Sequence, residues 1–193
     1  LAAEAERDRS NLGLALRGQS EYDEAKTHLE KAIDLDPKNG RAYFELGLIA
    51  GIQNKAEEAE TALAKAVKLS PNESLFWYAY GEVFRSTDRA DEAINAYRKA
   101  VELDPPYPKA QQKLGLLLVG KKEYDEAESV LIQAIRRDKT VPVNYLELGL
   151  VYAAKKKNDL AIENFEHFLQ IAPKHDADRG RAREELNALK RKR

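Results

Sequence analysis

The sequence predicts an all-α protein, a solenoid of five antiparallel helical hairpins followed by one capping helix. Glycine recurs every 34 residues, at Gly13, Gly47, Gly81, Gly115 and Gly149. An alanine follows each glycine by twelve residues, at Ala25, Ala59, Ala93, Ala127 and Ala161. Proline closes four of the five units, at Pro37, Pro71, Pro105 and Pro173. A fixed period of this length indicates supersecondary units that stack on one another.

The glycine column predicts that the two helices of each hairpin approach closely. Glycine within a helix costs about 1 kcal/mol relative to alanine, so a cost that recurs in every unit needs a packing reason. The alanines serve the same purpose on the facing helix. Larger apolar residues at helical spacing fill the remaining core. They are Leu16, Phe84, Leu118 and Tyr152 on the first helices, and Leu29, Leu63, Tyr97, Leu131 and Phe165 on the second helices.

Turn residues separate the expected helices. Residues 18–20 (Gly-Gln-Ser) and 120–122 (Gly-Lys-Lys) are expected to end a first helix, and Asp-Pro at 36–37 and 104–105 to end a second helix. Pro108 and Pro142 stand where the first turn of a helix tolerates proline. After residue 175 the columns stop, but Ala182, Leu186 and Leu189 still form one apolar stripe. This stripe predicts a single helix that covers the end of the fifth hairpin.

These columns resemble the tetratricopeptide repeat family, which has glycine, alanine and proline at the same period. The resemblance implies a right-handed superhelical solenoid. Its five units lie within residues 1–175, at 6–39, 40–73, 74–107, 108–141 and 142–175, and a capping helix with a basic end lies at 176–193. The chain departs from the family at Lys139, which replaces a proline, at Phe168, which replaces an alanine, and at Arg9, where a bulky residue is common.

The composition indicates a folded chain and excludes several classes of protein. Hydrophobic residues make up 43% and charged residues 34%, the net charge is −1, and there is no cysteine to form disulfides or thiolate sites. No apolar run approaches the ~18 residues that a membrane span needs. The tail at 190–193 is basic, but we expect a solvated helix end there, because the rest of the chain is acidic and no aromatic residues interleave. No nucleic-acid partner is expected.

We find no pattern of catalytic or metal-binding residues. His28, His167 and His175 lack the spacing of metal ligands, and Gly120-Lys121 lacks the remaining residues of a phosphate-binding loop. No serine stands in a nucleophile elbow. The sequence therefore predicts no enzymatic activity, no cofactor and no metal.

The first helix of each unit is expected to form the inner wall of the solenoid. The family resemblance assigns to this wall the second, fifth, sixth, ninth, twelfth and thirteenth positions of each unit. The wall is largely apolar with aromatic anchors, which favours binding of a partner protein. The predicted partner-binding residues are Phe44, Leu48, Tyr78, Glu82, Arg85, Lys109, Gln112, Lys113, Leu116, Leu146 and Leu150. We expect Phe44 and Tyr78 to lie outside the hairpin core, and Trp77 to lie within it.

One specific partner is not expected. Similar proteins that hold the acidic C-terminal tails of heat-shock chaperones use five clamp residues, of which only Lys109 and Lys113 have counterparts here. Phe44, Leu48 and Ala79 occupy the other three positions. A chaperone tail is therefore an unlikely partner.

The sequence favours a scaffold or adaptor that binds a peptide or helix of another protein in its groove. Two alternatives stay open: an assembly factor for a bacterial membrane complex, like the pilotin-like tetratricopeptide lipoproteins, and the non-catalytic part of a larger enzyme. Self-association is also possible. The chain begins at Leu1 and contains no methionine, so we interpret it as a mature or trimmed piece. We expect it to be soluble, in the cytoplasm or the periplasm.

Overall fold

A computed structural model describes residues 2–103 and 107–191, and within these ranges the protein consists of eleven helices and no strand. The predicted all-α helical repeat solenoid is confirmed. The chain divides into two compact bodies, an N-terminal body of residues 1–107 and a C-terminal body of residues 108–193. Pro105, which was expected to close the third unit, and the last two residues of the basic tail, Lys192 and Arg193, lie outside the described residues.

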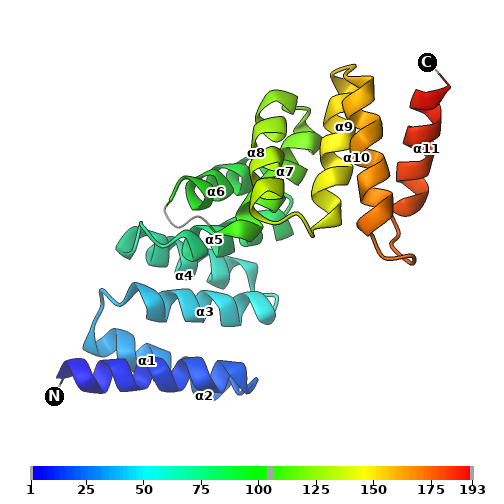
Figure 1. The fold of residues 1–193 in the computed structure, drawn as a ribbon. Helices are drawn as coiled ribbons and strands as arrows, with labels where there is room; N and C mark the ends of the chain where they lie inside the picture. The colour runs from blue at the N-terminus through cyan, green and yellow to red at the C-terminus, as the bar shows by residue number, and fades with distance from the viewer. Residues whose placement is uncertain (1, 104–106, 192–193) are drawn as a thin grey trace. The chain divides into compact units, whose positions relative to one another are not determined.

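Consecutive helices pair into hairpins in both bodies (Figure 1). The N-terminal body contains α1 (Ala2–Gly18), α2 (Tyr22–Leu35), α3 (Gly40–Ile52), α4 (Ala56–Leu69), α5 (Ser74–Ser86) and α6 (Ala90–Glu102). The C-terminal body contains α7 (Pro108–Lys121), α8 (Tyr124–Arg137), α9 (Pro142–Ala154), α10 (Asn158–Ile171) and α11 (Arg179–Lys190). Pro108 and Pro142 open α7 and α9, as predicted, because the first helical turn does not need their missing N–H.

The close approach predicted from the glycine column is present in every hairpin. A Cβ atom added at Gly81 would lie 2.6 Å from Cε1 of Tyr97, and one at Gly149 would lie 2.7 Å from Cε1 of Phe165. Both distances are shorter than van der Waals contact, so the large residue of the second helix fills the place of the missing side chain. The five alanines of the column are fully buried, namely Ala25, Ala59, Ala93, Ala127 and Ala161.

The turns after the first and seventh helices lie at the predicted segments 18–20 and 120–122, but their glycines are not the turn residues. Gly18 and Gly120 were expected in these turns, but they belong to α1 and α7. The left-handed residue of each turn is instead Ser20, Asn54, Asp88, Lys122 or Lys156, with φ between 57° and 67°. These positions recur at the 34-residue period without containing glycine. Each turn therefore places a side chain in a conformation that glycine adopts more readily.

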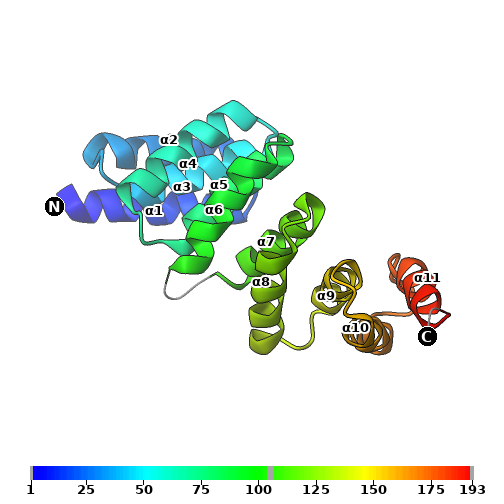
Figure 2. The ribbon, with the colours of Figure 1, turned by 90° about the horizontal axis from the view of Figure 1, so that it is seen from above.

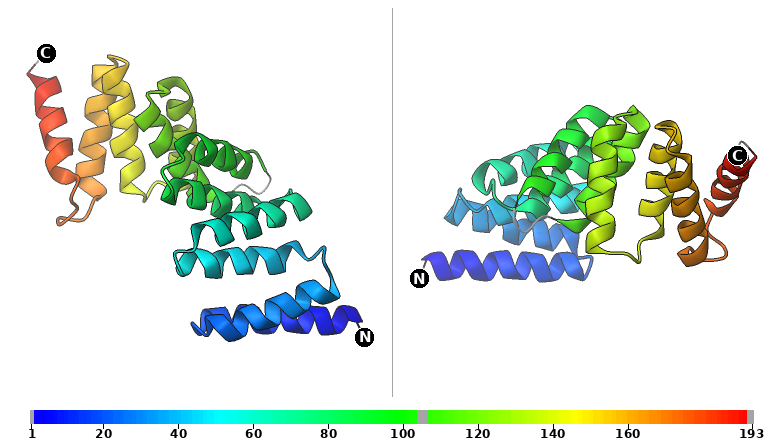
Figure 3. Two further views of the ribbon diagram at one scale, coloured as in Figure 1. Left: turned by 180° about the vertical axis from the view of Figure 1, so that it is seen from behind. Right: turned by 45° about the horizontal axis from the view of Figure 1, so that its top comes forward.

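The capping helix α11 packs on α10 in the C-terminal body (Figures 2 and 3). The predicted stripe is buried, with Ala182 fully buried and Leu186 and Leu189 nearly so. Arg179 fixes the start of the helix, because its Nη1 donates to the carbonyl oxygens of Leu169 and Ala172, each at 2.8 Å. These carbonyls lie at the C-terminal end of α10, which attracts a cation.

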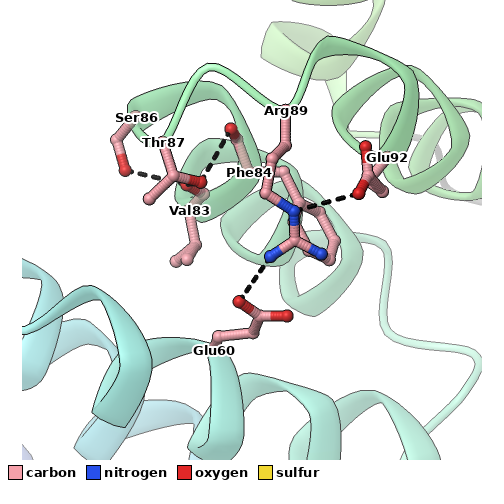
Figure 4. A network of polar contacts seen from close by, with 7 residues as sticks. All are labelled: Glu60, Val83, Phe84, Ser86, Thr87, Arg89 and Glu92. Carbon is pink, nitrogen blue, oxygen red and sulfur yellow. Dashed lines mark hydrogen bonds and ion pairs between the residues drawn. The ribbon is translucent and has the colours of Figure 1, made fainter.

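An ion pair joins the second and third hairpins (Figure 4). Arg89, at the N-cap of α6, donates from Nη1 to Glu60 of α4 at 2.7 Å and from Nε to Glu92 at 2.9 Å. Its guanidinium also lies over the ring of Phe84, 4.5 Å from the centroid. Arg89 therefore links α4, α5 and α6 at one point.

The repeat positions of Glu60 and Arg89 form two columns, and these columns also hold charged residues in other pairs of neighbouring hairpins. In the C-terminal body, Lys157 pairs with Glu128 at 2.9 Å, in the positions that correspond to Arg89 and Glu60. In the first and second hairpins these positions hold Lys26 and Lys55, which have the same charge. Both lysines approach Glu58 instead, at 3.9 and 3.8 Å.

Candidate protein-binding site

The N-terminal body contains an open hollow of about 650 Å³ between its three first helices, α1, α3 and α5. We call it the α1–α3–α5 groove. Its apolar lining includes Leu14, Phe44, Leu48, Ile52, Leu75 and Tyr78, and its charged lining is Arg17, Arg41, Glu45, Glu82 and Arg85. Every one of these residues belongs to a first helix, so the inner wall predicted from the sequence is the surface that is hollowed here.

Large apolar side chains stay exposed in this groove. Ile52 is 50% exposed and Leu75 is 38% exposed, while Leu48 and Tyr78 are half-buried. Gly51 widens the groove between them, because a Cβ atom at this position would meet nothing within 4 Å. The groove therefore combines apolar sides with an open centre, which suits contact with an apolar segment of another molecule.

Phe44 corrects one expectation about this wall. The sequence placed its side chain outside the core, but it is only 4% exposed and stacks on Phe76, with ring centroids 4.3 Å apart. The physical reason is that Phe76 of the next hairpin presents a large flat surface to the fifth position of α3. Phe44 thus belongs to the core that joins α3 to α5, although it also lines the groove. Trp77, expected in the core, is partly buried, and its Nε1 donates to the carbonyl of Pro71 at 2.8 Å.

The charged residues of the groove are mostly neutralised within the protein. Arg85 donates from Nε and Nη2 to the carboxylate of Glu82, at 3.1 Å each, and Arg17 donates to Glu45 at 2.6 Å. Arg41 is exposed, and no described residue forms an ion pair with it. Of the charged residues that line the groove within the described part of the chain, Arg41 alone has no ionic partner.

Tyr78 lies at the α5 side of the groove in an aromatic cluster. Its ring centroid lies 4.6 Å from that of Tyr107 and 5.8 Å from that of Tyr97. Burial, and then the charge of Glu82, raises the pKa of Tyr78 to about 12. Burial and the hydrogen bond that its hydroxyl donates to Glu82 also raise the pKa of Tyr97. Both tyrosines are therefore neutral hydrogen-bonding groups at physiological pH.

The inner wall of the C-terminal body, formed by α7 and α9, holds the other predicted residues. Lys109 is exposed, and Gln112, Lys113, Leu116 and Leu150 are half-buried. Leu146 corrects a second expectation, since it is only 1% exposed. The reason is that α9 is packed on several sides: residues 144–149 are all buried, which leaves the fifth position no open face. Leu146 is thus a core residue.

Sequence reasoning missed four residues of these walls, and three of them had a usable signal. Leu75 and Arg41 stand at the second position of a unit and Ile52 at the thirteenth, and both positions belong to the inner wall. The fourth, Glu147, is a buried carboxylate of α9. Its burial depends on the packing of neighbouring helices, which the residue pattern does not specify.

Family comparisons agree with this architecture. Sequence models described as tetratricopeptide repeat match residues 10–74 and 53–108, then 84–146, then 143–175. The chain belongs to the tetratricopeptide repeat family. Tetratricopeptide repeat proteins generally mediate protein–protein interaction and are typically non-catalytic. Among the described residues of this tetratricopeptide repeat protein, no cluster of three His, Asp or Glu side chains could hold a metal ion, and no helix is long and apolar enough to cross a membrane.

Several solved structures share the fold. YrrB, described as a TPR protein with an unusual peptide-binding site, has a TM-score of 0.77 at 24% identity and covers 94% of this chain and 90% of its own. MamA has a TM-score of 0.75 at 25% identity, and the match covers 95% of this chain and 97% of the MamA chain. PilF of Pseudomonas aeruginosa has a TM-score of 0.73 at 20% identity, and the match covers 99% of this chain and 91% of the PilF chain. A comparison with curated protein sequences found no significant match.

Proposed function

We propose that this tetratricopeptide repeat protein is a scaffold or adaptor that binds a segment of another protein in its α1–α3–α5 groove. The observation that supports the proposal most directly is the exposure of Ile52 and Leu75, at 50% and 38%, inside a hollow of about 650 Å³. Large apolar side chains that the fold leaves exposed in a concave surface are typical of a partner site. A peptide or an amphipathic helix would bury them.

The groove also contains groups that set the orientation of a bound segment. Tyr78 offers a neutral hydroxyl beside an apolar ring, a combination common at the centre of interfaces. Arg41 offers a cation that the protein itself does not neutralise, so an acidic residue of the partner would pair with it. Glu82 and Arg85 contribute less than the sequence suggested, because they already bind each other.

A selection of peptide ligands tests this proposal. A library of random 16-residue peptides is displayed on phage and selected against the whole chain, and the recovered peptides are titrated against variants. We expect Ile52→Asp and Leu75→Asp to weaken binding by at least ~10-fold, because each places a charge in a desolvated apolar contact. Leu12→Asp is the matched control, since Leu12 is 43% exposed on α1 and does not line the groove.

The titrations of the two groove variants and the control have three distinct outcomes. Loss of binding in the two groove variants, with binding retained in the control, supports the groove. Equal binding by all three variants and the parent assigns the peptide to another surface, and a selection that yields no specific peptide contradicts a peptide-binding function altogether.

The second candidate function is that of an assembly factor for a bacterial membrane complex. Two similar structures are PilF and PilW, the latter described as a widely conserved type IV pilus biogenesis factor, which covers 97% of this chain at 18% identity. Such identity supports the shared fold and no shared partner. Reading the full-length coding sequence for a lipoprotein signal distinguishes this candidate, and it also reveals any catalytic domain of a larger enzyme.

A further inference from the structure

The C-terminal body contains a buried carboxylate that its own residues leave without an ionic partner. Glu147 of α9 is only 8% exposed, and no described residue forms a hydrogen bond or an ion pair with its side chain. Burial raises the pKa of Glu147 above its ordinary value of 4.5. Its carboxylate oxygens keep some contact with solvent, but a charge that is largely desolvated and has no ionic partner is still costly.

The repeat supplies a direct comparison. Glu147 stands at the same position of its unit as Glu45, three periods earlier. Glu45 is equally buried, at 3% exposure, but it accepts a hydrogen bond from Nε of Arg17 at 2.6 Å. Arg17 lies on α1, the first helix of the preceding hairpin. The residue that corresponds to Arg17 on α7 is Val119, which has no group to donate.

The surroundings of Glu147 provide only partial compensation. Among the described residues, the charges that act on its carboxyl group are Arg181 of α11, which lowers the pKa, and Asp178 at the N-cap of α11, which raises it. No charged residue described on α7, α8 or α10 shifts it. Arg181 is exposed and forms no ion pair with Glu147. Burial outweighs the charge of Arg181, so the pKa of Glu147 stays raised.

Apolar residues flank the position. Leu116 stands three residues before Val119 on α7, and Leu150 stands three residues after Glu147 on α9, so each lies one turn along the same helix face. Both leucines are half-buried on the inner wall. Lysine and arginine side chains commonly pack their aliphatic stems on such surfaces while their charged ends reach an acidic group.

From the repeat positions and the missing ionic partner we infer that the inner wall of the C-terminal body holds a subsite for a cationic side chain, arginine or lysine, of a bound polypeptide. The cation occupies beside Glu147 the place that Arg17 occupies beside Glu45, and its stem lies over Val119, Leu116 and Leu150. This inference rests on the proposed function, because it assumes that the inner wall faces a partner. It adds the chemistry of that partner: a segment with a basic residue among apolar residues.

Installing the cation within the chain tests the geometry without any partner. In Val119→Arg, we expect the new guanidinium to pair with Glu147, which lowers the pKa of that carboxyl in a carbon-13 NMR titration. We also expect a higher urea midpoint, and Glu147→Gln should abolish the increase. Val119→Leu is the matched control for side-chain size. A titration of Glu147 that is the same in Val119→Arg and Val119→Leu shows that the position cannot accept a cation and overturns the inference.

The contribution of Arg181 is tested in the same titration. If Arg181→Ala leaves the effect of Val119→Arg unchanged, the subsite acts as inferred. If Glu147 titrates at or below its ordinary value in the parent and moves upward in Arg181→Ala, then Arg181 already neutralises it in solution, and the inference is wrong.

Peptides from the selection on the whole chain test the partner chemistry. Peptides whose binding is weakened by Leu150→Asp are assigned to the inner wall of the C-terminal body. We expect these peptides to contain arginine or lysine and to bind the Glu147→Gln variant at least ~10-fold more weakly than the parent. Glu163→Gln, on the exposed surface of α10, is the matched control. The inference is overturned if the peptides assigned to this wall bind Glu147→Gln as tightly as they bind the parent, or if the selection yields no peptide for this wall. Peptides of the α1–α3–α5 groove, which respond to Ile52→Asp, decide the proposed function separately.

Discussion

The close packing behind the glycine column can be measured with two alanine substitutions in one helix. In α7, a Cβ atom at Gly115 would lie 2.6 Å from Cδ2 and 2.9 Å from Cγ of Leu131, whereas a Cβ atom at Gly120 would meet nothing within 4 Å. Leu131 is fully buried, and its Cγ is a branch point, so rotation of the terminal methyl groups cannot relieve the contact. Gly115→Ala therefore overpacks the hairpin and Gly120→Ala does not.

The expected difference follows from two opposing contributions. Replacing glycine by alanine in a helix gains about 1 kcal/mol, with a smaller gain at Gly120 because it lies near the end of α7. Overpacking costs about 1–3 kcal/mol and applies only to Gly115. With a gain of about 0.5 kcal/mol at Gly120, the free energy of unfolding of Gly115→Ala should be lower than that of Gly120→Ala by about 0.5–2.5 kcal/mol. Each kcal/mol corresponds to about 2–4 °C in melting temperature for a chain of this size.

The assay is urea and thermal unfolding of both variants and the parent, followed by far-ultraviolet circular dichroism. The two positions lie in the same hairpin, so both report on the same cooperative segment of the repeat array. If Gly115→Ala proves as stable as Gly120→Ala, the column does not reflect a close approach of helices, and the packing explanation of the 34-residue glycine period must be abandoned.

Three further predictions concern the turns, the ion pairs and the buried carboxylate. Lys156→Gly should raise the urea midpoint, by up to about 1 kcal/mol in stability, because glycine adopts a positive φ without strain; a lower midpoint would contradict the strain. A double-mutant cycle on Glu60 and Arg89 should give a coupling free energy of about 0.2–1 kcal/mol that shrinks in 1 M NaCl; zero coupling at low salt would show that the pair contributes nothing. Burial raises the pKa of Glu147, so this residue favours folding below its ordinary pKa and opposes it as the pH rises through the raised value. Glu147→Gln should therefore melt higher than the parent at about pH 7 and equally near pH 4, and a difference that does not vary with pH would exclude titration of Glu147 as its cause.

Sequence reasoning predicted most of the fold because the fold depends on local, repeated choices. The columns of glycine, alanine and large apolar residues define the two helices of a hairpin and the faces that pack, and Tyr97 and Phe165 lie where those columns placed them. The capping helix was predictable for the same reason, since Ala182, Leu186 and Leu189 follow helical spacing. Each of these inferences needs only the period of a helix and the size of a side chain.

The candidate site was less predictable because exposure depends on neighbours in other hairpins. Phe44 and Ile52 are both large apolar residues of α3 on wall positions, yet one is covered by Phe76 and the other remains open. Nothing in α3 itself distinguishes them. The left-handed column was not predicted for a different reason: two of the turns were located at Ser20 and Lys122, but serine and lysine do not signal a positive φ as asparagine and aspartate do, so the five residues form no single sequence pattern.

The charged columns between neighbouring hairpins have a consequence for the order of the repeats. Glu60 and Arg89 attract each other across one junction, whereas the two earlier positions of these columns, Lys26 and Lys55, would repel. Deleting residues 40–73 would keep the 34-residue period but place Lys26 opposite Arg89. The ion pair between Glu60 and Arg89 would be lost, and the new junction would hold two cations, as the first junction does now. The hairpins are therefore not interchangeable modules. Their edges differ in charge, so a shortened array that loses this ion pair should be less stable by about 0.2–1 kcal/mol even though each hairpin in it is intact.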